Sequence, residues 1–188
     1  PPDWATMPRT FCSRNMALIV SGITPCVLCG EKLGDEPISA TSGCAFPPGT
    51  KLYPYCDAPF HIRCLDHWDH REAFSRGYFE IRREDFQAMR TLLHDHPLWV
   101  LGCGPAPADQ LPYYARVYFR DWPQCLNCDF RDWDQFLKEP FSDEITGGVL
   151  DIAEEVVSWL RIEVPNLEAL ATLRTETIKA EQAGAQNP

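Results

Sequence analysis

The chain has 188 residues, of which 45% are hydrophobic and 12% aromatic, so it can bury a core and is not an intrinsically disordered protein. Its 17 basic and 27 acidic side chains give a formal net charge of −10. A surface this acidic repels phosphate backbones, and no apolar run approaches the ~20 residues of a membrane-spanning helix. We therefore expect neither nucleic acid nor a membrane as the partner.

The nine cysteines favour metal binding in a reducing compartment over disulfide bonds. The apolar stretch at residues 17–20 is too short for the hydrophobic part of a secretion signal. We therefore expect a cytoplasmic location, or a nuclear one if the organism is eukaryotic.

The chain divides by pattern into four parts. Residues 1–15 have no periodicity and are predicted to form a loose N-terminal arm. Residues 16–140 are predicted to form a zinc-binding α+β domain, and residues 141–183 a helical C-terminal region. Residues 184–188 are predicted to fray.

Two short pairs of metal-ligand residues come first along the chain. Cys26 and Cys29 are separated by two residues and precede Gly30, which suits a tight turn with positive φ. His61 and Cys64 have the same spacing, and both can project from the first turn of a helix. Three thiolates and one imidazole in two such pairs predict a closed, structural zinc site.

A pair on a turn followed by a pair on a helix is the treble-clef arrangement. The helix is expected to run from about His61 to Ser75, and a second from Glu84 to His94, where Pro97 closes it. Short strands are expected over residues 98–101 and 113–119. The residues His94 and His96 at the end of the second helix are interpreted as a solvated cap rather than a metal site.

A further pair, Cys125 and Cys128, follows the strands. Its spacing is compatible with metal binding or with two buried thiols, while a redox pair would need a thioredoxin-like context that is missing here. Beyond it, residues 149–160 show an amphipathic helical pattern. Asn166 is expected to cap a last helix that extends to about Gln182.

The segment from Cys56 to Trp68 resembles the centre of a RING finger. In the variety with two histidines, a cysteine lies five residues before the histidine of a Phe-His-x-x-Cys motif, an aliphatic residue follows the motif, and a tryptophan comes three residues after that. The matching positions here are Cys56, Phe60, His61, Cys64, Leu65 and Trp68. The resemblance covers about 40 residues and implies a cross-braced fold with two zinc ions.

By this resemblance Cys26, Cys29, His61 and Cys64 hold the first zinc, and Cys56, Cys125 and Cys128 contribute to a second one. The family's remaining ligand falls at Ala58, which cannot bind a metal. The residues left as candidates for the fourth ligand are Cys44, Cys103, His67 and His70. The predicted cofactor is therefore one zinc ion, with a second one if this site forms.

Three functions remain open. The first is a zinc-stabilised protein–protein interaction module that binds another protein. The second is a RING-like ubiquitin-ligase module, in which Val27, Leu28 and Trp68 dock a conjugating enzyme. The third, suggested by charge and size, is a bacterial immunity-type inhibitor of a basic toxin. The chain lacks the hydrolase, phosphate-loop and metalloprotease motifs, so a catalytic role of its own is disfavoured unless it is RING-type ubiquitin transfer.

Overall fold

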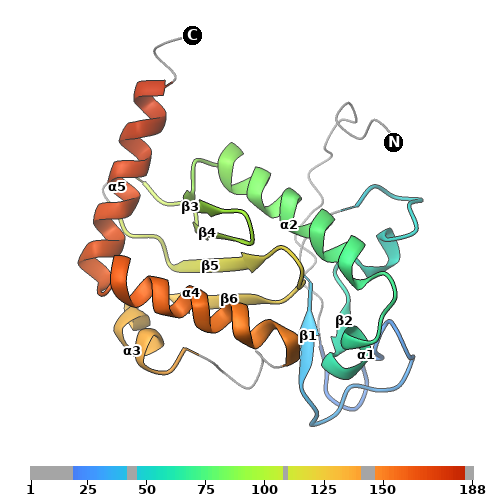
Figure 1. Cartoon of the computed structure of the whole chain (residues 1–188). Helices are drawn as coiled ribbons and strands as arrows, with labels where there is room; N and C mark the ends of the chain where they lie inside the picture. Colours follow the sequence, from blue (N-terminus) through green and yellow to red (C-terminus); the bar gives the residue numbers. More distant parts are fainter. Residues whose placement is uncertain (1–18, 42–45, 108–109, 141–146, 185–188) are drawn as a thin grey trace.

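The computed structural model describes residues 19–41, 46–107, 110–140 and 147–184, which form a mixed α+β fold (Figure 1). The predicted arm at residues 1–15 and nearly all of the predicted frayed tail lie outside these ranges. The strands are β1 (Ile38–Ala40), β2 (Pro59–His61), β3 (Leu92–His96), β4 (Trp99–Cys103), β5 (Tyr114–Phe119) and β6 (Cys125–Asp129). The helices are α1 (Ile62–Asp66), α2 (Arg71–Ala88), α3 (Trp133–Lys138), α4 (Leu150–Glu163) and α5 (Leu167–Gly184), with short 3₁₀ turns at Tyr53–Tyr55, Phe130–Asp132 and Gly147–Val149.

Strands β3 to β6 form an antiparallel sheet in which each strand pairs with the next along the chain. Side chains alternate between the two faces of a strand, so each face of this sheet builds its own core. Figure 1 shows α4 in front of the sheet and α2 on its other side. The sheet is thus the middle layer of the molecule.

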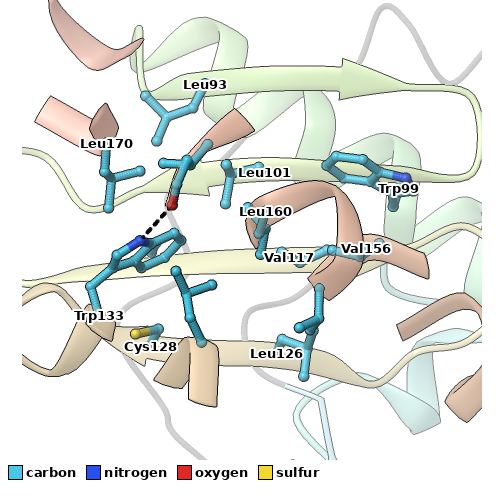
Figure 2. Close-up of a cluster of buried hydrophobic side chains, with 14 of the residues drawn as sticks. Leu93, Trp99, Leu101, Val117, Leu126, Cys128, Trp133, Val156, Leu160 and Leu170 are labelled. Carbon is cyan, nitrogen blue, oxygen red and sulfur yellow. Dashed lines mark hydrogen bonds between the residues drawn. The ribbon is translucent and has the colours of Figure 1, made fainter. Parts of the chain in front are cut away.

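The face toward α4 carries the larger core, which is drawn in Figure 2. Val156 and Leu160 of α4 are completely buried on it, and Leu170 of α5 and Trp133 of α3 close one end. The indole N–H of Trp133 donates a hydrogen bond to the carbonyl oxygen of Val164 at 3.0 Å. Each such buried apolar side chain stabilises the fold by roughly 1.5–3 kcal/mol.

The opposite face packs against α2 through a core rich in aromatic rings. Phe86 lies directly over Gly102 of β4, where an added Cβ would come within 2.4 Å of the ring. A glycine is therefore required at this point for α2 to approach the sheet. Earlier in the same helix, Phe74 packs 5.4 Å from the ring of Trp68, beside the β1–β2 region. Helix α2 therefore packs against both the four-stranded sheet and the region beside β1 and β2.

The first predicted helix is divided into two in the structure. Instead of one helix from His61 to Ser75, α1 ends at Asp66 and α2 begins at Arg71. The turn between them places Trp68 against Tyr55, with 4.4 Å between the ring centroids. The packing of the Trp68 ring in this turn therefore overrides the helical periodicity of the sequence from His61 to Ser75.

The predicted helix from Glu84 to His94 is wrong beyond Ala88, because residues 92–96 form strand β3. Arg90 adopts a left-handed conformation with φ of 56°. Its N–H donates to the carbonyl oxygen of Gln87 and the N–H of Thr91 donates to that of Phe86, a pattern that terminates helices. The chain therefore leaves α2 here and turns into the sheet.

Other predicted elements are confirmed. Strands β4 and β5 and helices α4 and α5 occupy nearly the predicted ranges. The carbonyl oxygen of the Asn166 side chain accepts a hydrogen bond from the N–H of Ala169 at 2.9 Å, as an N-cap does. Of the helices in the described ranges, none combines the length and apolar character needed to cross a membrane.

Candidate metal centre

A tight turn carries the first two ligand residues. The N–H of Gly30 donates to the carbonyl oxygen of Cys26 at 2.9 Å, and the N–H of Cys26 donates to that of Glu31 at 2.8 Å. Gly30 has the predicted positive φ, at 77°. These bonds close the loop so that Cys26 and Cys29 can face the same point.

The second two ligand residues lie where β2 meets α1. His61 is the last residue of β2, and Cys64 lies in the short helix that follows. The N–H of Val27 donates to the carbonyl oxygen of Pro59 at 3.1 Å, which fixes the cysteine turn beside β2. Strand β1 supports β2 from its other side, with Ile38 paired to His61.

The structure brings all four residues together. The Nδ1 atom of His61 lies 3.4 Å from Sγ of Cys29 and 3.7 Å from Sγ of Cys64. The ligand atoms of the four residues, including Cys26, all lie within 4.8 Å of one another. In a tetrahedral zinc site the sulfur and nitrogen ligands are separated by about 3.5–3.8 Å. The donor set and its spacing therefore fit a zinc ion.

No known protein-family model, curated protein or solved structure matches this chain. The structure shows the Cys/His cluster, while no match identifies it as part of a RING finger or a treble clef.

The thiols of the cluster differ in their surroundings. Burial, together with the neighbouring sulfurs of Cys29 and Cys26, raises the pKa of Cys64 to about 12. For Cys26, burial raises the pKa, but hydrogen bonds from the backbone N–H groups of Cys29 and His61 outweigh it and the net shift is downward. Four electron-rich donors packed this closely favour a bound cation, which stabilises the thiolates.

Sequence analysis missed a carboxylate behind the histidine. Nε2 of His61 is buried on the side away from the thiols and lies 3.2 Å from Oε1 of Glu36, although the geometry is not that of a hydrogen bond. Glu36 is in turn held by Arg63, whose Nε lies 2.7 Å from its Oε2. Arg63 also binds Glu31, on the cysteine turn, at 2.7 Å. Nothing in the spacing of Glu36 marks it in the sequence, since it approaches His61 only through the pairing of β1 with β2.

The second predicted set is not gathered in the described part of the chain, where the one Cys/His group close enough for a metal is the four-residue cluster. Cys125 and Cys128 lie three residues apart in strand β6, so they point to opposite faces of the sheet. Cys125 packs on the α2 side and Cys128 in the α4 core. Cys56 accepts a hydrogen bond from the N–H of Phe46 at 3.4 Å.

The candidates for a fourth ligand are also dispersed. Cys103 is buried in the α4 core, where burial raises its pKa to about 11. His67 interacts through Nδ1 with the carbonyl oxygen of Arg63 at 2.8 Å. His70 packs beside the ring of Trp68, and Cys44 lies outside the described residues.

The interpretation of His94 and His96 as a solvated helix cap is wrong. Both belong to β3, and both rings pack against Trp99, at 4.8 and 5.3 Å between centroids. His94 also contacts Trp159 of α4 at 4.3 Å. Burial lowers the pKa of His94, which favours its neutral form in this aromatic contact.

Proposed function

We propose that the chain holds one structural zinc ion at Cys26, Cys29, His61 and Cys64 and acts as a zinc-stabilised protein–protein interaction module. The observation that carries the zinc assignment is the gathering of the four donor atoms within 4.8 Å of one another, with two sulfur–nitrogen distances close to those of a tetrahedral site. Four protein ligands complete the coordination and leave no position for a substrate, so the metal has a structural role.

The size of the surrounding core supports a structural role for the metal. The cluster beneath the site contains three buried apolar residues, Ala58, Phe60 and Leu65. So small a core does not offset the conformational entropy of ordering the turns around it. A bound zinc ion supplies the missing folding free energy in such regions.

The loop that leads into the cysteine turn supports a contact with another protein. Ile23 is 69% exposed and Val20 is 40% exposed in this loop. The loop is fixed, since the N–H of Gly22 donates to the carbonyl oxygen of Leu33 at 2.6 Å and the N–H of Leu33 to that of Thr24 at 2.9 Å. An apolar side chain displayed on a rigid loop suits a protein partner.

Zinc content per chain tests the metal assignment. Elemental analysis and native mass spectrometry of the purified protein are expected to give one zinc ion per chain. A metal-free protein whose cysteines are paired in disulfides would contradict the proposal.

Partner capture tests the interaction surface. Ile23→Asp is expected to abolish the capture of proteins that the unmodified chain retains from a cell extract. Ile162→Asp is the matched control, because Ile162 is 75% exposed and belongs to α4, which packs on the four-stranded sheet and not around the Cys/His cluster. Equal capture by both variants and by the unmodified chain would refute a partner surface at this loop.

The other two functions have weaker support. A RING-type ubiquitin ligase needs two cross-braced zinc ions, and the described residues gather the ligands of one. A toxin inhibitor rests on the net charge of −10 and stays a prediction.

Zinc retention is expected to fall as the pH falls. With the pKa of Cys64 raised to about 12, its thiol is protonated in the metal-free protein at neutral pH. Zinc binding must displace this proton, so the affinity rises with pH and falls as protons compete for the sulfurs. A titration from pH 7.5 to about 5 with a zinc indicator dye will measure the release. Constant occupancy throughout would mean that the thiols do not hold the ion.

Replacement of Glu36 by alanine is expected to weaken zinc binding by about 10- to 100-fold, as is typical when the carboxylate behind a ligating histidine is removed. The comparison variant is Glu31→Ala, because Glu31 also pairs with Arg63; its Oε2 lies 3.9 Å from Sγ of Cys29, whereas Oε1 of Glu36 lies beside the ring of His61. Competition with a chelator of known affinity measures both variants. An equal loss in the two would contradict a specific role of Glu36 in orienting the histidine.

A further inference from the structure

A second cluster of polar groups lies on the α2 face of the sheet, away from the Cys/His site. Tyr114, Arg116 and Tyr118 alternate along β5 and therefore share this face. Nη1 of Arg116 donates to the hydroxyl of Tyr118 at 3.5 Å. From α2, the guanidinium carbon of Arg82 lies 5.8 Å from the ring centre of Tyr118. Two guanidinium groups thus flank one tyrosine.

Arg116 is held in place without an acidic partner. Its guanidinium carbon lies 4.5 Å above the ring of Tyr114, which fixes the plane of the group. Within the described ranges no carboxylate lies at ion-pair distance from it, and its buried Nε has no hydrogen-bond acceptor. Leaving a buried guanidinium N–H unsatisfied costs free energy, which an acceptor from outside the chain would recover.

The acidic groups nearest in the fold are already engaged. Asp85 pairs with Arg82 at 3.2 Å. Asp129 of β6, which pairs with Tyr114 of β5, forms an ion pair with Arg131. The pKa of Asp129 is lowered to about 2, chiefly by its hydrogen bond from the side chain of Arg131. Neither carboxylate is therefore available to Arg116.

The cluster has an open side. Asn127 of β6 pairs directly with Arg116 across the strands and is exposed to solvent. In the described part of the sheet β6 is the last strand, so no further strand covers this flank. The amide nitrogen of Asn127 lies 3.4 Å from Sγ of Cys125, on the same face.

We infer that Arg116 forms a binding site for an oxyanion, a carboxylate or phosphate group of a ligand, on the α2 face of β5 and β6. A guanidinium presents its N–H groups in a planar fork that matches two oxygens of such a group. The contact with Tyr114 holds that fork in one orientation before the ligand arrives, which reduces the entropy lost on binding. The site is independent of the proposed zinc module.

The arginine Nε–H resonances in a ¹H–¹⁵N NMR spectrum test this inference. Titration of the full, zinc-loaded chain with inorganic phosphate, and separately with N-acetylglutamate, at constant ionic strength should shift the Arg116 resonance saturably with at least one probe. A response to phosphate alone would identify a phosphoryl ligand, and a response to the carboxylate probe an acidic one. No shift, or an equal shift of every arginine with chloride as well, would overturn the inference and leave Arg116 a packing residue.

Three variants make the test specific. Arg116→Gln should weaken binding at least tenfold, whereas Arg120→Gln, which removes the same charge from an arginine paired with Asp121, should leave it unchanged. Asn127→Asp places a carboxylate opposite Arg116, so it should abolish binding of the external probe and raise Tm by about 2–4 °C. Asn127→Ala is its control and should do neither. If Arg116→Gln does not fold, the variants Asn127→Asp and Asn127→Ala still test the site. A probe that binds Asn127→Asp as tightly as it binds the unmodified chain would contradict the inference.

Discussion

Cys64→Ser is expected to lose the zinc ion and to unfold the segment around β1, β2 and α1. The hydroxyl of serine is a poor zinc ligand, and the three remaining donors would be left close together without a cation. A structural zinc site contributes apparent binding free energy of about 10–16 kcal/mol to folding in small zinc domains, more than most domains have in total stability. Elemental analysis, together with hydrogen exchange of the β1 and β2 amides, measures both losses.

Cys125→Ser is the matched control for this variant. Cys125 is also a partly buried cysteine, but it packs on the α2 face of the sheet, outside the Cys/His cluster. It should keep one zinc ion per chain. A Cys64→Ser protein with full zinc content and protected β2 amides would refute the site, and zinc loss in Cys125→Ser would revive a second one.

Trp133→Ala is expected to be the most damaging change in the core on the α4 face. The side chain is 1% exposed, and its removal leaves a large cavity between α3 and the sheet. It also deprives the carbonyl oxygen of Val164 of its hydrogen bond. The loss in the free energy of unfolding should be about 3–5 kcal/mol. Urea denaturation followed by far-UV circular dichroism measures it.

Trp133→Phe separates the two contributions, because it keeps most of the ring and removes the indole N–H. Its expected cost includes about 1 kcal/mol for the hydrogen bond, plus a smaller packing loss. Both Trp133 variants should retain one zinc ion in the folded state, unlike Cys64→Ser. A Trp133→Ala protein as stable as the unmodified chain would mean that this ring is not part of the core.

The four residues of the Cys/His cluster could be predicted as two pairs because the signal of each pair is local. Two residues that bind from one turn must lie close in sequence, and Gly30 provides the positive φ that this turn needs. The pair Cys125 and Cys128 has the same spacing, but Asp129 follows it instead of glycine and the segment pairs with β5. The cysteine spacing alone does not distinguish a turn from a strand, which is why the second site was predicted.

The end of α2 could not be predicted for a different reason. Phe86, Met89, Leu92 and Leu93 continue the helical spacing, so periodicity favoured a longer helix. The residue that terminates the helix in the left-handed conformation is Arg90, where glycine or asparagine would be the recognisable signal. The surroundings of Glu36 and Arg116 could not be predicted because they depend on strand pairing, of β1 with β2 and of β5 with β6. The amphipathic pattern of α4 and the cap of α5, in contrast, depend only on residues within one segment, so the sequence predicts them.

Helix α2 determines how the chain can be divided in experiments. Near its start, Phe74 contacts the rings of Phe60 and Trp68 beside the Cys/His cluster, and near its end Phe86 covers Gly102 of the sheet. A fragment that stops before Arg71 would lack one wall of the ring cluster, while a fragment that starts after Ala88 would expose an apolar sheet face to water. In the zinc-loaded protein the Cys/His cluster and the sheet are therefore expected to melt in a single transition and to resist separation by limited proteolysis.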